Sequence, residues 1–273
     1  MIPHPPRDLV QDMLRVCARL SALGFTPATD GNVSARISDT HILCTPTALA
    51  KGEVRADDLV VVAMDGTHAA GSRRASTEVR MHLEYYRQRM DVRAVVHAHP
   101  VHATAWATAG RALDACVFPE VIVSLGTVPL AAYATPSTED VPLSIAPFTA
   151  THDAVLLANH GVVTAGASLA TALHRMEKVE HTAHVLWLAE TLGGPRVLSR
   201  EQVQRLLDVA PASYGVDASS RPACNTNLAS SAPSAPSSEA SADGHAGRDA
   251  SPVLSGISEL VSHTLRELGF TKD

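Results

Sequence analysis

Several features that would quickly assign this 273-residue sequence to a class of protein are missing from it. Basic residues are not in excess, because 22 Lys and Arg are outnumbered by 28 Asp and Glu, for a formal net charge of −6. The sequence therefore predicts no basic surface for nucleic acid. No apolar run reaches the roughly 18–20 residues of a membrane-spanning helix, and the opening MIPHPPRD does not resemble a signal peptide. We expect a cytoplasmic protein that binds neither nucleic acid nor a membrane.

Cysteine is also scarce, and the cysteines that are present lie far apart in the sequence. They are Cys17, Cys44, Cys116 and Cys224, and no two of them form a CxxC pair. A disulfide framework is typical of small secreted chains, whereas proteins of the cytoplasm keep their thiols reduced. The sequence therefore predicts reduced thiols at all of these positions.

What the sequence does contain is an alternation of helical and strand-like segments over its first 214 residues. Apolar residues recur at helical spacing, or fall in short runs that are bounded by polar turns. Helices are predicted at residues 6–25, 76–90, 101–110, 168–193 and 200–210, and strands within 31–64, at 93–100 and at 154–166. This interleaving predicts a three-layer α/β domain over residues 1–216.

The composition changes after that domain. Residues 217–252 are dominated by Ser, Ala and Pro, and Leu228 is their only large aliphatic residue. Such a segment cannot bury enough apolar surface to offset an ordering entropy of ~1–2 kcal/mol per residue, so we expect a disordered linker. Residues 253–273 regain apolar residues at i, i+3 and i+4 spacing. That spacing predicts a short amphipathic helix, which must dock on another surface because it has no core of its own.

Two histidines at the end of a predicted strand, in RAVVHAHP, suggest a metal site. Residues two apart in a strand face the same side, so His97 and His99 would project together. His160, in LLANHGVV, ends another apolar run, and Gly161 after it would let the backbone turn sharply beside a ligand. Three neutral imidazoles with an open fourth position form a common catalytic Zn²⁺ site. Buried core histidines are the alternative, because spacing alone does not show that the three converge.

A carboxylate and two hydroxyls come together at the predicted start of the helix in STEVRMHLEYY. The free N–H groups and the dipole at a helix N-terminus favour an anion, and Ser76 and Thr77 would add donors beside Glu78. An ordinary N-cap followed by an acidic first turn is the alternative. Two further turns, at residues 29–36 and 44–52, are also rich in short polar residues and are most simply loops.

Five short motifs, GNVS, TPT, STE, HAHP and NHG, occur in this order along the chain. Together they resemble the class II aldolase/adducin family, and the resemblance extends from about Leu9 to Tyr214. It implies a three-layer α/β/α domain built around a central, mainly antiparallel sheet. It also implies a homotetramer with active sites at the interfaces between subunits.

The same resemblance implies a role for particular residues. The implied ligands of one Zn²⁺ per subunit are His97, His99 and His160, and the implied acid/base is Glu78. The implied contacts to the substrate phosphate come from Gly31, Asn32, Thr47, Ser76 and Thr77. Tyr214 would protonate the departing aldehyde oxygen in a neighbouring subunit, with a tyrosine that simply packs against the domain as the alternative. The implied reaction cleaves a ketose 1-phosphate, such as L-fuculose or L-rhamnulose 1-phosphate, to dihydroxyacetone phosphate and L-lactaldehyde through a metal-stabilised enediolate.

The resemblance is compatible with other activities as well. The family also contains sugar-acid-phosphate decarboxylases and sugar-phosphate 4-epimerases, although the epimerases carry Asp where this chain has Glu78. A non-catalytic scaffold with a structural metal site is a further alternative. Ala48 stands where the aldolases have glycine, which would alter one backbone contact to phosphate.

The tail suggests a partner of a different kind. Some aldolases of this family are cargo of bacterial microcompartments and resemble this chain in carrying a short amphipathic helix on a low-complexity linker. The resemblance implies that residues 253–273 bind a shell protein or other cargo, which would place the protein inside a microcompartment. Docking of this helix on its own tetramer is the alternative.

Overall fold

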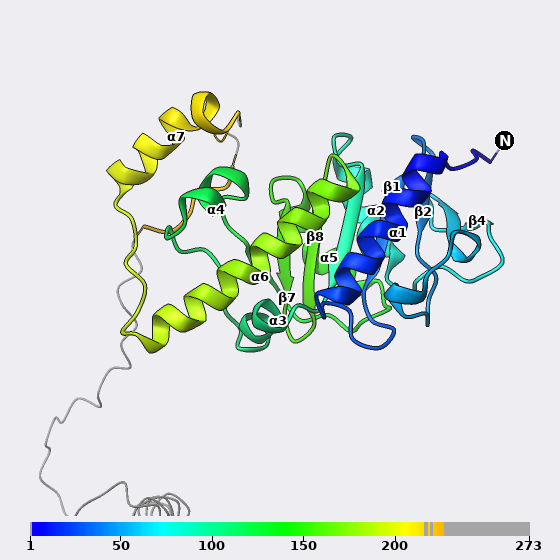
Figure 1. The fold of residues 1–273 in the computed structure, drawn as a ribbon, viewed down its shortest axis with the longest axis horizontal. Helices are drawn as coiled ribbons and strands as arrows, with labels where there is room; N and C mark the ends of the chain where they lie inside the picture. Colours follow the sequence, from blue (N-terminus) through cyan, green and yellow to red (C-terminus); the bar gives the residue numbers. More distant parts are fainter. Residues whose placement is uncertain (1, 216–217, 219–220, 227–273) are drawn as a thin grey trace, which may run out of the picture. The chain divides into compact units, whose positions relative to one another are not determined.

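An eight-stranded sheet forms the centre of the part of the chain that the computed structural model describes, which is residues 2–215, 218 and 221–226 (Figure 1). The strand order is β4-β3-β2-β1-β5-β8-β7-β6, and neighbouring strands run antiparallel except β6 and β7, which are parallel. The strands are β1 (Asn32–Arg36), β2 (His41–Cys44), β3 (Val60–Ala63), β4 (His68–Ala70), β5 (Ala94–Ala98), β6 (Leu130–Ala131), β7 (Ala154–Leu157) and β8 (Gly161–Gly166).

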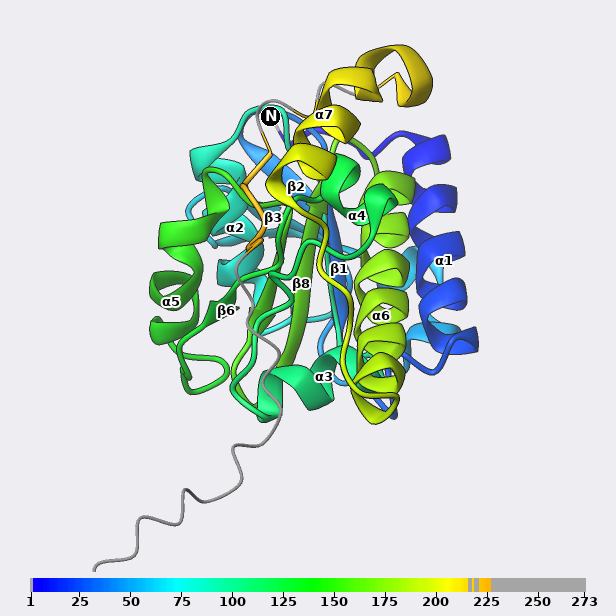
Figure 2. The ribbon, with the colours of Figure 1, turned by 90° about the vertical axis from the view of Figure 1, so that its left-hand side faces the viewer.

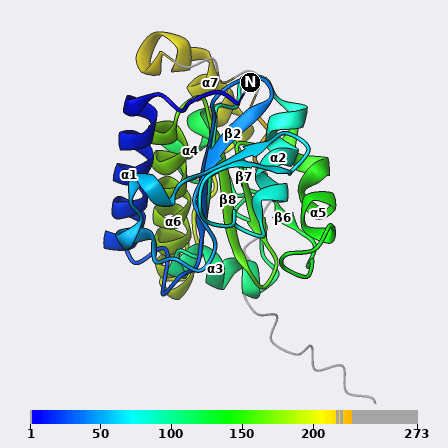
Figure 3. The same cartoon turned by 90° about the vertical axis from the view of Figure 1, so that its right-hand side faces the viewer.

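Helices cover both faces of this sheet (Figures 2 and 3). One face carries α1 (Arg7–Ala22), α3 (Val101–Thr108) and α6 (Leu169–Thr191), and the other carries α2 (Val79–Gln88) and α5 (Asp140–Thr149). Each face has its own apolar core, because successive strand residues point to opposite sides. In β5, for example, Val96 packs in the first core and Val95 in the second. The predicted three-layer α/β/α fold with a mainly antiparallel sheet is therefore confirmed.

Shorter elements complete the domain. The 3-10 turns η1 (Lys51–Glu53) and η2 (Ala56–Asp58) connect β2 to β3. The helices α4 (Pro119–Ser124) and α7 (Arg200–Tyr214) pack against each other around Val123 and Ala210. Although α6 has 23 residues, no helix in the described part of the chain is both long and apolar enough to cross a membrane.

The structure differs from the sequence prediction at residues 154–166 and 140–149, and it also contains α4 and β6, which the sequence pattern does not predict. Residues 154–166, predicted as one strand, form the antiparallel pair β7 and β8, joined by a turn in which Asn159 has a φ of +57°. Asn adopts this left-handed conformation more readily than most residues. The sequence predicts no helix at α5, because Pro142 and Pro147 resemble helix breaks. Pro142 is the third residue of that helix, where its missing N–H would have no partner within the helix anyway.

The prediction of reduced thiols is wrong for one pair of cysteines. Cys116 and Cys224 form a disulfide across 108 residues of sequence, whereas Cys17 and Cys44 are free and buried. Cysteines so far apart carry no spacing signal, and only the folded chain brings them together. The disulfide joins the end of the described chain to the loop that precedes α4.

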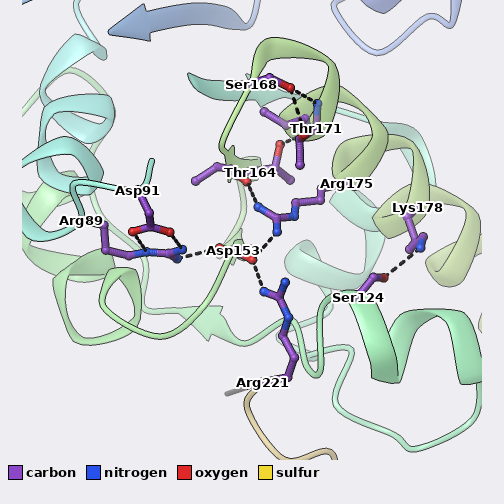
Figure 4. Close-up of polar contacts among 12 residues, drawn as sticks. Arg89, Asp91, Ser124, Asp153, Thr164, Ser168, Thr171, Arg175, Lys178 and Arg221 are labelled. Carbon is purple, nitrogen blue, oxygen red and sulfur yellow. Dashed lines mark hydrogen bonds and ion pairs between the residues drawn. The ribbon is translucent and has the colours of Figure 1, made fainter. Parts of the chain in front are cut away.

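Polar contacts also fix residues 221–226 to the domain. Arg221 joins two other arginines around the buried carboxylate of Asp153 (Figure 4). The backbone of Asn225 pairs with the loop that contains Cys116. The predicted disorder is therefore wrong for this short stretch of the linker.

The predictions for the rest of the tail fall on residues that the structure does not describe. The predicted amphipathic helix at residues 253–273 and residues 227–252 of the predicted linker lie outside the described residues. Binding of that helix to a shell protein, or to its own tetramer, stays a prediction.

The thiols provide a test of this arrangement. Burial raises the pKa of Cys17 and of Cys44 to about 12, so neither thiol forms the reactive thiolate near neutral pH. Iodoacetamide without reductant is expected to label no cysteine of the native protein and two of the denatured protein, and prior reduction should raise this to four. Intact mass spectrometry counts the labels. Two labels on denatured, reduced protein, or four on denatured protein without reductant, would contradict the arrangement.

Candidate metal and catalytic site

The ends of two neighbouring strands, β5 and β8, bring the predicted metal ligands together. His97 lies in β5, where it pairs in register with Asn32 at the start of β1 and with Val163 of β8. His99 follows the end of β5, and His160 is the residue directly before β8. Because β5 and β8 are antiparallel neighbours, the end of one meets the beginning of the other. The three imidazoles therefore meet at one edge of the sheet.

The imidazoles are close enough to share one ion. Their ring centroids are 4.8, 4.9 and 5.0 Å apart, and one nitrogen from each lies within 4.8 Å of the others. Nδ1 of His97 donates a 2.9 Å hydrogen bond to the carbonyl of Val162, so the lone pair of this neutral ring is on Nε2, which lies 3.1 Å from Nε2 of His99. Burial lowers the pKa of His97 to about 3, so this imidazole is neutral, as a metal ligand must be. Three neutral imidazoles fit a divalent metal ion that keeps an open position.

A carboxylate adjoins the histidines at the N-terminus of α2. Oε1 of Glu78 lies 3.2 Å from Nε2 of His160, and Oε2 lies 3.5 Å from Nε2 of His97. Nδ2 of Asn32 donates a 2.8 Å hydrogen bond to Oε2. Burial by itself would raise the pKa of Glu78, but the electrostatic interaction with the neighbouring His97 and the hydrogen bonds from His160 and Asn32 outweigh the effect of burial. The pKa of Glu78 therefore lies below its usual range, and the carboxylate is ionised.

Two glycines allow the backbone to pass close to these rings. A Cβ on Gly161 would lie 2.6 Å from Cδ2 of His99 and 2.7 Å from the carbonyl oxygen of Ala98. Gly31 has a φ of +73°, and a Cβ there would lie 2.8 Å from the carbonyl oxygen of His97. All three distances are shorter than real Cβ contacts, so any larger residue at Gly31 or Gly161 would displace a metal ligand. The glycines of the GNVS and NHG motifs are therefore required by the geometry of the site.

A polar cavity of about 320 Å³ opens beside the histidines. All the predicted substrate-binding residues line it, namely Gly31, Asn32, Thr47, Ser76 and Thr77. Glu78, His99 and His160 line the same cavity, whereas His97 is fully buried. The structure therefore places the predicted phosphate contacts, acid/base and metal ligands around one space.

Besides the buried His97, Tyr214 is the predicted site residue that does not line this cavity. It is the last residue of α7 and is 47% exposed. Its predicted role concerns the site of a neighbouring subunit, so that role stays a prediction.

The lining also includes residues that the sequence pattern did not mark. Asp30 lies at the edge of the cavity, and Oγ of Ser137 lies 2.7 Å from Oγ1 of Thr77. Asp30 lies in the polar turn at residues 29–36, but no motif marks Asp30 or Ser137 individually. Ala48 lines the cavity with a φ of +55°, a conformation that favours the glycine expected at this position.

The buried ammonium group of Lys51 supports two of the loops that line the cavity. Lys51 is 2% exposed, and its Nζ donates hydrogen bonds of 2.9 Å to the carbonyl of Thr29 and 2.6 Å to the carbonyl of Leu49. Burial lowers the pKa of Lys51, and nearby acidic groups, Asp30 and Glu78 among them, partly oppose this shift. The sequence pattern did not single out this lysine. Its positive charge would favour an anion in the cavity.

Comparison with known protein families agrees with the fold and the site. The class II aldolase and adducin N-terminal domain matches residues 11–187. This range contains every predicted site residue except Tyr214. The chain belongs to the class II aldolase and adducin family.

Characterised relatives cover most of the same region. The 3-oxo-tetronate 4-phosphate decarboxylase of Escherichia coli (strain K12) is 33% identical over 187 residues, which are 67% of this chain and 87% of that protein. The L-fuculose phosphate aldolase of Escherichia coli O6:H1 (strain CFT073) is 31% identical over 201 residues, 73% of this chain and 93% of that protein. A solved L-fuculose 1-phosphate aldolase structure has a TM-score of 0.69 at 31% identity, covering 74% of this chain and 96% of that one. The chain is thus an enzyme of the class II aldolase type, a lyase.

Proposed function

We propose that this enzyme is a Zn²⁺-dependent aldolase that cleaves a ketose 1-phosphate, such as L-fuculose or L-rhamnulose 1-phosphate, to dihydroxyacetone phosphate and L-lactaldehyde. The observation that carries the proposal is the position of the Glu78 carboxylate, within 3.5 Å of the inner nitrogens of two of the three converging histidines. A structural metal site is closed by four protein ligands. Here three imidazoles converge beside an open polar cavity, which favours catalysis over a purely structural role.

The chain's own residues account for the movement of protons. Bound Zn²⁺ would act as a Lewis acid on the carbonyl oxygen of the substrate. Cleavage of the C3–C4 bond requires that a proton leave the C4 hydroxyl and that a proton reach C3. Glu78 lines the cavity as an ionised carboxylate, so it can take up a proton and return it to carbon. The hydrogen bond from Asn32 holds this carboxylate in one orientation.

The hydroxyl-lined part of the cavity suits a phosphate. Ser76 and Thr77 precede Glu78, the N-cap residue of α2, and the helix dipole and free N–H groups at this end of the helix favour an anion. Thr47 adds a third hydroxyl to the lining, and Lys51 adds a positive charge behind it. A phosphate held here would fix the orientation of the reacting bond, which lowers the entropic part of the barrier.

A sugar-acid-phosphate decarboxylase is the second candidate, because the decarboxylase relative is 33% identical to this chain. Loss of CO₂ from a 3-oxo acid requires the same kinds of catalytic group as the aldol cleavage. The carbonyl oxygen must be polarised, and a proton must reach the carbon that loses CO₂. Glu78 could deliver that proton as well, so the two reactions differ mainly in the group that leaves.

We further propose that a second copy of the chain covers an apolar cleft between α3 and α6, as in the homotetramer that the motifs imply. The cleft has a volume of about 430 Å³, and Val101, Trp106 and Trp187 are among its lining residues. Val101 is 67% exposed and Trp187 is 50% exposed, and a cluster of exposed apolar side chains is typical of an interaction surface. Light scattering that gave only the 28.7 kDa mass of one chain would contradict this assembly.

Release of dihydroxyacetone phosphate from a panel of ketose 1-phosphates tests the proposed reaction. Protein stripped with a chelator is expected to release none, and added Zn²⁺ is expected to restore release. A coupled assay with glycerol-3-phosphate dehydrogenase and NADH measures the product directly. If no ketose 1-phosphate is cleaved while a 3-oxo acid phosphate loses CO₂, the decarboxylase is favoured instead.

A further inference from the structure

A carboxylate outside the predicted ligand set lies against the outer edge of one metal-site histidine. Oδ2 of Asp30 is 3.4 Å from Nδ1 of His99. The other nitrogen of that ring, Nε2, lies 3.1 Å from Nε2 of His97 and thus faces the shared centre. The two nitrogens of His99 therefore have different neighbours, a carboxylate outside and the other imidazoles inside.

The backbone around Asp30 is fixed on both sides. Its own N–H donates to the carbonyl of Pro27 at 3.0 Å, and Nζ of Lys51 donates to the carbonyl of the preceding residue, Thr29. On the other side, Gly31 packs against the backbone of the strand that carries the histidines. The carboxylate therefore extends from a well-held turn, even though the side chain is 48% exposed.

His99 is held by the same turn region. Its backbone N–H donates a 2.8 Å hydrogen bond to the carbonyl of Phe25, five residues before Asp30. One loop thus fixes the position of the imidazole through the backbone and presents a carboxylate to its outer nitrogen. The contact results from how the fold joins this loop to the end of β5, rather than from a chance approach of two surface side chains.

We infer that Asp30 is a positioning residue for the metal ligand His99. Its carboxylate accepts the N–H of Nδ1, which keeps the lone pair of Nε2 directed at the shared centre and makes that nitrogen a better donor. His97 has an equivalent arrangement, because its Nδ1 donates to the carbonyl of Val162. The inference rests on the proposed function, since it assumes that the three imidazoles bind Zn²⁺.

The affinity of the protein for Zn²⁺ tests this inference. Asp30→Ala is expected to bind Zn²⁺ about 10–100-fold more weakly than the wild type, as is usual when the partner of a ligating histidine is lost. Asp30→Asn keeps an acceptor oxygen without the charge, so its loss should be smaller. Competition with a chromophoric chelator at a fixed pH measures the dissociation constants. Co²⁺ substitution adds a spectroscopic readout, because a misoriented His99 should change the visible absorption of the bound Co²⁺.

A matched control separates this role from general effects of charge. Asp65 is also an exposed aspartate in a turn, but its carboxylate accepts hydrogen bonds from Thr67, in the turn between β3 and β4. Asp65→Asn should leave the affinity for Zn²⁺ unchanged. Wild-type affinity in Asp30→Ala would overturn the role of Asp30 while leaving the proposed function in place. Failure of the wild-type protein itself to bind Zn²⁺ would overturn both.

Discussion

Glu78→Gln is expected to lower sugar-phosphate cleavage by roughly 10²–10⁴-fold while leaving Zn²⁺ in place. Gln keeps the size of the side chain and an oxygen that can accept the hydrogen bond from Asn32, but it cannot take up or release a proton near neutral pH. The implied metal ligands are histidines, so one Zn²⁺ per chain should remain. The kcat/KM for release of dihydroxyacetone phosphate, together with the metal content by atomic emission, measures both parts of the expectation.

Glu84→Gln provides the matched control for this substitution. Glu84 lies in the same helix, α2, but accepts a hydrogen bond from Gln88 instead of contacting the site. Its variant should keep the wild-type kcat/KM. Full activity in Glu78→Gln would contradict the acid/base role. Loss of the metal together with activity would show that Glu78 acts as a ligand instead.

Replacing His160 with alanine is expected to reduce bound Zn²⁺ from one per chain to almost none after dialysis, and to abolish cleavage with it. Catalytic Zn²⁺ sites have three protein ligands, and this variant keeps two. His160 lies next to a turn with 12% of its side chain exposed, so its loss does not open a large cavity in the core. The substitution also removes a group that lowers the pKa of Glu78, so that pKa should rise toward its usual value.

His181→Ala is the control for the loss of a histidine. His181 lies on the exposed surface of α6, beside Phe118, and does not belong to the three-histidine group. This variant should retain one Zn²⁺ per chain and full activity. A His160→Ala protein that bound Zn²⁺ as tightly as the wild type would contradict the site described above.

The fold could be predicted from the sequence where the local pattern and the tertiary structure agree. The long helix α6 and the strand β5, which contains His97, have clear apolar patterns, and both form as predicted. The helix α5 could not be predicted, because Pro142 and Pro147 are residues that usually break helices. Packing against α2, which the local sequence does not show, stabilises this helix. The bond between Cys116 and Cys224 joins positions 108 residues apart, so only tertiary structure determines it.

The part of the site that lies in short sequence motifs could also be predicted. Its histidines and glycines stand in short motifs, because close backbone approach at Gly31 and Gly161 leaves few residue types possible. Asp30, Lys51 and Ser137 do not stand out in this way. Asp30 and Ser137 contact residues that are far away in the sequence, and Lys51 contacts backbone carbonyls. Many residue types could occupy such loop positions, so the local sequence does not mark them. Their roles become visible only when the loops are placed in space.

Exchange of hydrogen at C3 of dihydroxyacetone phosphate in D₂O tests the central claim most directly. This reaction requires only the removal and return of a proton beside a polarised carbonyl, so it does not depend on which aldehyde the enzyme releases. We expect the Zn²⁺-loaded protein to incorporate deuterium at C3, and chelated protein and Glu78→Gln to incorporate it far more slowly. If the Zn²⁺-loaded wild-type protein caused no exchange, the three histidines and Glu78 would not form the proposed catalytic centre.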